Sequence, residues 1–174
     1  RNFFSIILLI FLISCSAPNS PSPSFNKFLY SKSSMTKQLQ SLDANFKVIL
    51  LYSGMDGTNF KRISSLNLSN KPVIIGLSLA HNDSPYFVDL LKNANTMPIG
   101  KKLFAKNSGI YRDPKMNVEQ IELNNISSIT VKTYIAGLGF TNNDLIYKRT
   151  SIFRKDKEYM QVIEYILPSI HNWI

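Results

Sequence analysis

The chain has 174 residues, which is the length of one domain with room for a hydrophobic core. Its 20 Lys and Arg residues against 11 Asp and Glu residues give a net charge of +9, scattered without a basic helix or a nucleic-acid motif, so we expect it to attract small anions and not nucleic acid. One cysteine, Cys15, and two isolated histidines, His81 and His171, exclude a disulfide framework and argue against a metal site or a Ser-His-Asp triad.

The first 24 residues have the pattern of a membrane-anchoring leader. Residues 3–13 are almost wholly apolar, which is too short to span a bilayer as a helix but is typical of the apolar region of a signal peptide. They run into the sequence Leu-Ile-Ser-Cys at 12–15, which resembles the lipobox of bacterial lipoproteins, so we expect Cys15 to be lipidated. The Ser- and Pro-rich residues 16–24 predict a flexible tether, which leaves 25–174 as the expected domain.

A helix and three strands open the domain. Ser34 can cap a helix over residues 35–42, whose apolar residues have helical spacing. Segments rich in branched and aromatic residues then predict strands at 46–52, 60–68 and 73–80. Because short turns separate these strands, we expect sequential neighbours to pair in the antiparallel sense.

Two more helices precede a long strand-like region. Asp83 or Ser84 starts the first of these helices, and Pro98 starts a second, shorter one. The chain is then strand-like from about 116 to 168, with turns at 137–139 and 154–157. Strands dominate this pattern, so we predict an α+β domain with a single antiparallel β-sheet and helices packed on one face.

Glu164 is a carboxylate in the middle of a predicted strand. Strand side chains alternate, so Glu164 shares a face with Met160, Val162 and Ile166. A lone acid on an apolar face is costly unless it is paired or protonated, which makes Glu164 a candidate functional group. The alternative is a partly exposed edge strand that carries a solvated acid.

Arg62 has a similar position on the predicted strand at 60–68. It shares a face with Phe60, Ser64, Leu66 and Leu68. A guanidinium among apolar side chains is a candidate anion-binding group. The alternative is an arginine on an edge strand whose stem packs while its charged end reaches water.

Five segments in order resemble the chorismate–pyruvate lyase family over roughly residues 28–170. They are Ser34-Met35-Thr36 before a short helix, Arg62 on a strand ahead of Lys71-Pro72, Met97-Pro98-Ile99-Gly100-Lys101 before Leu103-Phe104, Tyr111-Arg112, and a closing hairpin with Glu164-Tyr165-Ile166-Leu167-Pro168. The Pro-Ile-Gly form is most similar to the cyanobacterial branch and its plastid-encoded relatives in red algae.

The resemblance implies a chorismate lyase-like fold and a lyase that splits chorismate into 4-hydroxybenzoate and pyruvate without a cofactor. It places the ligand contacts of the family on Met35, Arg62, Ile99 and Glu164. In the family, the arginine and the methionine backbone hold the ring carboxylate. The glutamate and the backbone after the proline hold the far, 4-hydroxyl end of the ligand.

These residue types suit that chemistry. A guanidinium offers two parallel charge-assisted hydrogen bonds to a carboxylate, so we expect Arg62 to anchor chorismate, which is a dianion. We expect Glu164 to bind the hydroxyl and to handle the proton, because an acid on an apolar face can stay protonated near neutral pH. Arg112 is a candidate second anion contact, with a salt bridge to Asp113 or another acid as the alternative.

Two other functions remain open at this point. The first is a non-catalytic module that binds an aromatic or anionic small ligand, because the effector domains of GntR-type regulators resemble the same sheet. The second is a structural lipoprotein whose cavity is filled by side chains. We expect a monomer that is anchored to a membrane through its leader, with the plastid stroma or the bacterial cytoplasm as the alternative location.

Overall fold

A computed structural model describes residues 21–174, so Cys15 and the apolar leader lie outside the described residues. The described chain forms one sheet of seven strands: β1 (Lys47–Asp56), β2 (Asn59–Leu68), β3 (Lys71–His81), β4 (Tyr111–Arg112), β5 (Asn117–Glu122), β6 (Leu145–Lys155) and β7 (Glu158–Ile166). Its helices are α1 (Pro23–Leu29), α2 (Met35–Leu42), α3 (Pro85–Lys92), α4 (Ile99–Leu103) and α5 (Ile129–Gly137), with two 3-10 turns, η1 (Leu123–Asn125) and η2 (Pro168–Asn172).

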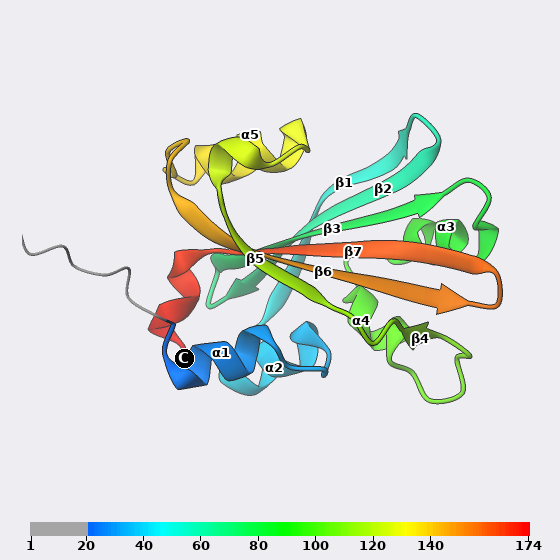
Figure 1. Cartoon of the computed structure of the whole chain (residues 1–174), viewed down its shortest axis with the longest axis horizontal. Coiled ribbons are helices and arrows are strands. Elements are labelled where there is room, and N and C mark those ends of the chain that lie inside the picture. Colours follow the sequence, from blue (N-terminus) through cyan, green and yellow to red (C-terminus); the bar gives the residue numbers. More distant parts are fainter. Residues whose placement is uncertain (1–20) are drawn as a thin grey trace, which may run out of the picture.

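All strand pairs are antiparallel, in the order β1-β2-β3-β7-β6-β4, and β5 pairs with β6 on the same edge as β4 (Figure 1). The α+β class and the single antiparallel sheet are therefore confirmed. The predicted helices before the first strand, after the third strand and at the Pro-Ile-Gly segment are present as α2, α3 and α4.

One face of the sheet carries two apolar cores with a polar band between them. The first core lies under α1 and α2 and includes Leu39 and Ile74. The second lies under α3 and α4 and includes Phe87 and Met160. Because the side chains between these cores are mainly polar or absent, the helices leave a gap there, and this gap positions the candidate site.

Helix α5 corrects two predictions. It covers the opposite face, where Val131 and Ile135 pack with Ile63 and Leu77, so the prediction of helices on one face only is wrong (Figure 1). The strand-like interpretation of this segment is also wrong. Its branched residues favour a strand, but Val131 and Ile135 are four residues apart, and burial of that helical face decides the local structure.

Helix α1 extends the folded domain beyond the expected boundary. The tether was expected to reach residue 24, but the Ser22 side chain accepts a hydrogen bond from the Phe25 backbone N–H at 3.2 Å and caps a helix that starts at Pro23. Phe25 is only 1% exposed, which anchors α1 in the core. Among the described helices, none combines the length and the apolar character needed to cross a membrane.

Candidate functional site

The gap between the two cores is a pocket with an internal cavity of about 50 Å³, or about 600 Å³ of empty space when the part open to solvent is included. It lies between the sheet and the first turns of α2 and α4. All five residues singled out from the sequence as ligand contacts line it: Met35, Arg62, Ile99, Arg112 and Glu164. An internal cavity of this size has room for a few water molecules, so side chains leave part of the pocket unfilled.

Two rows of paired residues form the floor of the pocket. Antiparallel pairing aligns Ser64, Gly76, Glu164 and Arg149 in one row and Arg62, Ser78, Val162 and Ser151 in the next. Gly76 contributes no side chain at the centre of the first row, and a Cβ atom there would approach the Ser64 hydroxyl only to 3.5 Å. The glycine therefore keeps the floor open between β2 and β7.

Arg62 is buried in the pocket wall without a carboxylate partner among the described residues. It is 2% exposed, and its Nη2 donates to the backbone carbonyls of Asn95 at 2.8 Å and Met97 at 3.2 Å. Its Nη1 donates to the Ser64 hydroxyl at 3.3 Å, and its Nε has no partner. Burial lowers the pKa of the Arg62 guanidinium below its usual value. An anionic ligand would supply the missing negative charge.

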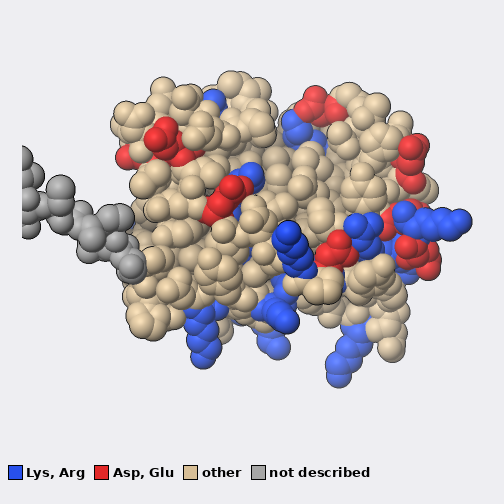
Figure 2. All heavy atoms as spheres, viewed as in Figure 1, with Lys and Arg blue, Asp and Glu red and all other residues tan. Residues whose placement is uncertain are grey.

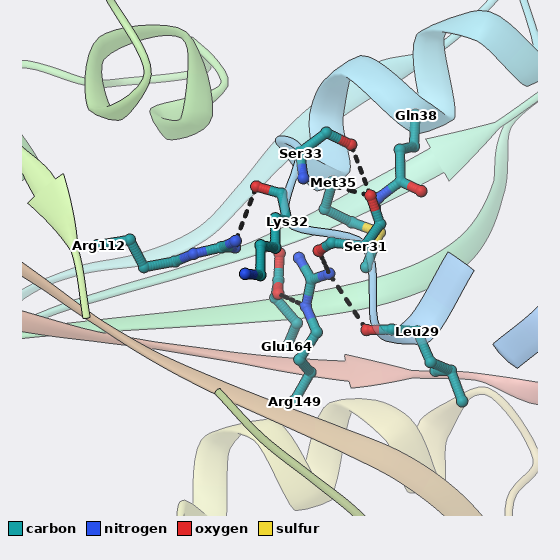
Figure 3. A network of polar contacts seen from close by, with 9 residues as sticks. All are labelled: Leu29, Ser31, Lys32, Ser33, Met35, Gln38, Arg112, Arg149 and Glu164. Carbon is teal, nitrogen blue, oxygen red and sulfur yellow. Dashed lines mark hydrogen bonds and ion pairs between the residues drawn. The ribbon is translucent and has the colours of Figure 1, made fainter. Parts of the chain in front are cut away.

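Glu164 lies in the same pocket but is paired with a different arginine. The Arg149 Nε donates to Glu164 Oε2 at 2.6 Å, and the two side chains are 3% and 12% exposed (Figure 3). The expectation of a lone acid on an apolar face is therefore wrong. The Arg149 Nη1 also donates to the backbone carbonyls of Leu29 at 3.4 Å and Ser31 at 3.3 Å, which ties the α1–α2 connection to this pair.

Arg112 reaches the pocket from β4. Its Nη2 donates to the Lys32 carbonyl at 2.7 Å (Figure 3). Its guanidinium lies 5.7 Å from the centre of the Phe104 ring. The alternative salt bridge with Asp113 is wrong, because Asp113 pairs with Arg154 at 2.8 Å. Burial and the charge of Arg149 lower the pKa of Arg112, while Glu164 acts in the opposite direction.

The starts of α2 and α4 form the rim of the pocket. Met35 and Ile99 occupy the first helical positions, where backbone N–H groups have no acceptor within their own helix. The two helix starts lie close together, because a Cβ atom on Gly100 would fall 2.5 Å from the Ser34 hydroxyl. Glycine at this position therefore permits the close approach, and a larger residue would displace the Ser34 hydroxyl.

The electrostatic character of the pocket favours anions. Arg62, Arg112 and Arg149 face a single lining carboxylate, Glu164. Residues 21–42 and 93–112, which supply α1, α2, α4 and their connections, contain seven basic residues and no Asp or Glu: Lys27, Lys32, Lys37, Lys101, Lys102, Lys106 and Arg112. Figure 2 shows Lys and Arg side chains projecting along the lower margin of the molecule, where these helices lie in Figure 1. Such a field raises the local concentration of anions at the mouth.

Ser151 is a pocket residue that the sequence analysis missed. Its hydroxyl and the Arg62 Nε are two of the three buried polar side-chain atoms without a partner in the described chain, and both residues line the pocket. Buried polar atoms are rarely left unpaired in native proteins, so a ligand or water is expected to contact them. No group of three His, Cys, Asp or Glu residues in the described range could hold a metal ion.

Comparison with known proteins gives a fold likeness and no family. No family model matches the chain, and no curated protein matches it. The crystal structure of gene product SA0254 from Staphylococcus aureus subsp. aureus N315 is similar with a TM-score of 0.50 and 9% sequence identity, over 79% of this chain and 90% of that one. At this identity, the likeness describes the fold alone.

Proposed function

We propose that this chain is a chorismate–pyruvate lyase with a chorismate lyase-like fold. The observation that supports the proposal best is the presence of Arg62 and Glu164 on the floor of one pocket, separated by β3. Two strand spacings and a step of two residues along the strands place their backbones about 12 Å apart, and in this proposal a ring-sized ligand lies between them over Gly76. The excess of positive charge among the lining residues suits a substrate with two carboxylates.

In this proposal, Arg62 anchors the ring carboxylate with a charge-assisted bond from its unpartnered Nε. The backbone N–H of Met35, at the start of α2, is available to the same carboxylate. Arg112 holds the carboxylate of the enolpyruvyl group, and the Glu164 oxygen that Arg149 does not engage accepts from the ring hydroxyl.

The reaction is an elimination that makes the ring aromatic. The C–O bond between the ring and the enolpyruvyl group breaks, the adjacent ring carbon loses its hydrogen as a proton, and the released enolate takes up a proton at carbon to become pyruvate. The contribution of the protein is to orient the ether and to manage one proton, through proximity and acid–base assistance. The pair formed by Arg149 keeps the Glu164 carboxylate at a fixed position for that role.

A second candidate is a binding module that holds an anionic ligand without catalysis. The ion pair between Glu164 and Arg149 favours this candidate, because a carboxylate that already accepts a charge-assisted bond is better suited to binding a hydroxyl than to giving up a proton. Such a module needs the arginines and the open floor but no turnover.

Incubation of the 174-residue chain with chorismate, with 4-hydroxybenzoate and pyruvate measured by chromatography, distinguishes these candidates. The lyase predicts equal amounts of both products from the wild type and loss of at least 100-fold of the rate in Arg62→Ala and Glu164→Gln. Arg154→Ala is the matched control, because Arg154 is outside the pocket and pairs with Asp113. A folded wild type without product, together with binding of 4-hydroxybenzoate by calorimetry, would favour the binding module.

A further inference from the structure

Strand β1 leaves one edge of the sheet open. Within the described residues, β1 pairs only with β2, and Figure 1 shows no strand beyond it. Natural proteins usually protect such edges with charged residues, prolines or a covering element, because an unpaired strand pairs readily with another chain. β1 is ten residues long, and its only charged residues are Lys47 and Asp56, at its two ends.

The uncharged centre of β1 is apolar and exposed. It has the sequence Val-Ile-Leu-Leu-Tyr-Ser-Gly-Met over residues 48–55. Ile49 is 45% exposed, Met55 is 50% exposed, and Tyr52 is also exposed. An uncovered edge of this length and composition favours association.

A bulge gives this edge a self-complementary pattern. The register of β1 against β2 shifts between Leu50 and Tyr52, so Leu51 is an extra residue. Without the bulge, Lys47 and Asp56 would lie on opposite faces of the sheet, because they are an odd number of residues apart. With the bulge, both lie on the same face, opposite Asn67 and Asn59 of β2.

We propose that β1 pairs in the antiparallel sense with β1 of a second copy of this chain, which makes one sheet continuous across a two-fold axis. With the axis between Leu51 and Tyr52, Lys47 faces the partner's Asp56 and Asp56 faces the partner's Lys47. The side chains of each such pair lie on the same face, as cross-strand pairing requires. A two-fold axis needs a self-complementary surface of this kind. We therefore propose a dimer in place of the monomer expected from the sequence.

The existing contacts of the two charged residues are compatible with this pairing. Asp56 accepts from Lys61 of its own chain through Oδ2, which leaves Oδ1 for a second donor. Lys47 Nζ donates to Asn70 Oδ1 at 3.2 Å and has further protons to donate. The interface does not depend on the proposed lyase activity, so either proposal can fail without the other.

Sedimentation equilibrium of the 174-residue chain in a non-ionic detergent, over a concentration range, tests the interface. The wild type is expected to be a dimer, and Ile49→Lys is expected to weaken association at least tenfold by placing a charge in the apolar edge. Leu145→Lys is the matched control, because Leu145 is 50% exposed on β6, away from β1. A monomeric wild type, or an equally strong dimer in Ile49→Lys, would overturn the proposal.

Two single charge changes test the register. Lys47→Glu alone and Asp56→Lys alone each oppose like charges across the two-fold axis, so each variant is expected to associate at least tenfold more weakly than the wild type. Mixed together, the two variants form a heterodimer in which both facing pairs again have opposite charges, and association returns to within about threefold of the wild type. A mixture that associates no better than its components would overturn the pairing.

Discussion

Arg149 on β6 and Glu164 on β7 face each other across the closing hairpin, and their side chains meet at 2.6 Å beneath the α1–α2 connection. Arg62, two strands from Glu164 across β3, has no such acid among the described residues. The two buried arginines of the pocket floor therefore have different electrostatic environments. One belongs to a compensated pair, and the other retains a charge that the fold does not neutralise.

Replacement of Arg62 by methionine is expected to separate binding from stability. Loss of a charge-assisted bond of about 2 kcal/mol weakens the binding of 4-hydroxybenzoate about 30-fold or more. The free energy of unfolding is expected to fall by only about 1–2 kcal/mol, because the carbonyls of Asn95 and Met97 lose a donor while an uncompensated buried charge is removed. Calorimetric titration and urea unfolding measure the two effects, and a loss of stability above about 3 kcal/mol would contradict this account.

Replacement of Arg149 by methionine is expected to lower the stability of the fold more than Arg62→Met does. It leaves the Glu164 carboxylate without its partner and releases the carbonyls of Leu29 and Ser31. We expect a loss of about 3 kcal/mol in the free energy of unfolding. The double variant Arg149→Met/Glu164→Met is expected to recover most of it, since no unpaired charge remains. Strictly additive losses in this double-mutant cycle would show that the pair does not couple.

Two glycines in helices are expected to respond in opposite directions to alanine. Gly100→Ala places a Cβ atom 2.5 Å from the Ser34 hydroxyl, which must shift within the pocket rim, so thermal stability and ligand affinity are expected to fall together. Gly137→Ala, at the end of α5, meets nothing within 4 Å and gains up to about 1 kcal/mol from helix propensity. Differential scanning calorimetry compares the pair. Equal shifts in both variants would exclude the close approach as the cause.

Alkaline pH is expected to destabilise the fold through Tyr165. Burial raises the pKa of Tyr165 to about 12, with a smaller contribution from the charge of Glu119. Between pH 10 and 12 the unfolded chain has lost this proton while the folded chain keeps it, so the unfolded state binds fewer protons and stability falls with rising pH. The group contributes a loss of about 1.4 kcal/mol per pH unit in that window.

The variant Tyr165→Phe isolates this contribution from the other groups that titrate at high pH. Urea unfolding at pH 8, 9, 10 and 11 is expected to give a shallower decline above pH 9 in the variant than in the wild type, with equal slopes between pH 8 and pH 9. Parallel declines across the whole range would mean that Tyr165 ionises equally easily in both states.

Part of the site was predictable because strand alternation is a local property. The pattern around Arg62 and Glu164 placed each on the face of the sheet that the pocket occupies. The partner of Glu164 was also within reach. In a hairpin with its turn at Asp156-Lys157, the antiparallel register places Arg149 opposite Glu164, and Lys155 opposite Glu158 closes the pairing. Counting residues back from this turn along both strands would have identified Arg149 as the partner of Glu164.

Other features depend on contacts between distant parts of the chain. The hydrogen bonds from Arg62 go to the carbonyls of Asn95 and Met97, in a connection whose path is set by the packing of α3 and α4. Helix α5 has branched residues that favour a strand, and only burial of Val131 and Ile135 against the far face selects the helix. The spacing of residues along the sequence therefore predicts neither that Arg62 lacks a carboxylate partner nor that α5 covers the second face of the sheet.

The open floor at Gly76 has a consequence for how this protein could diversify. On the same face of β3, Ile74 and Ala80 are apolar residues that fill the two cores, whereas Gly76 and Ser78 between them line the pocket. An exchange to alanine or serine there meets no backbone clash and shortens the cavity by one or two heavy atoms. A change at this one codon can therefore reduce the size of the pocket without altering the arginines that line it or the cores that hold the sheet.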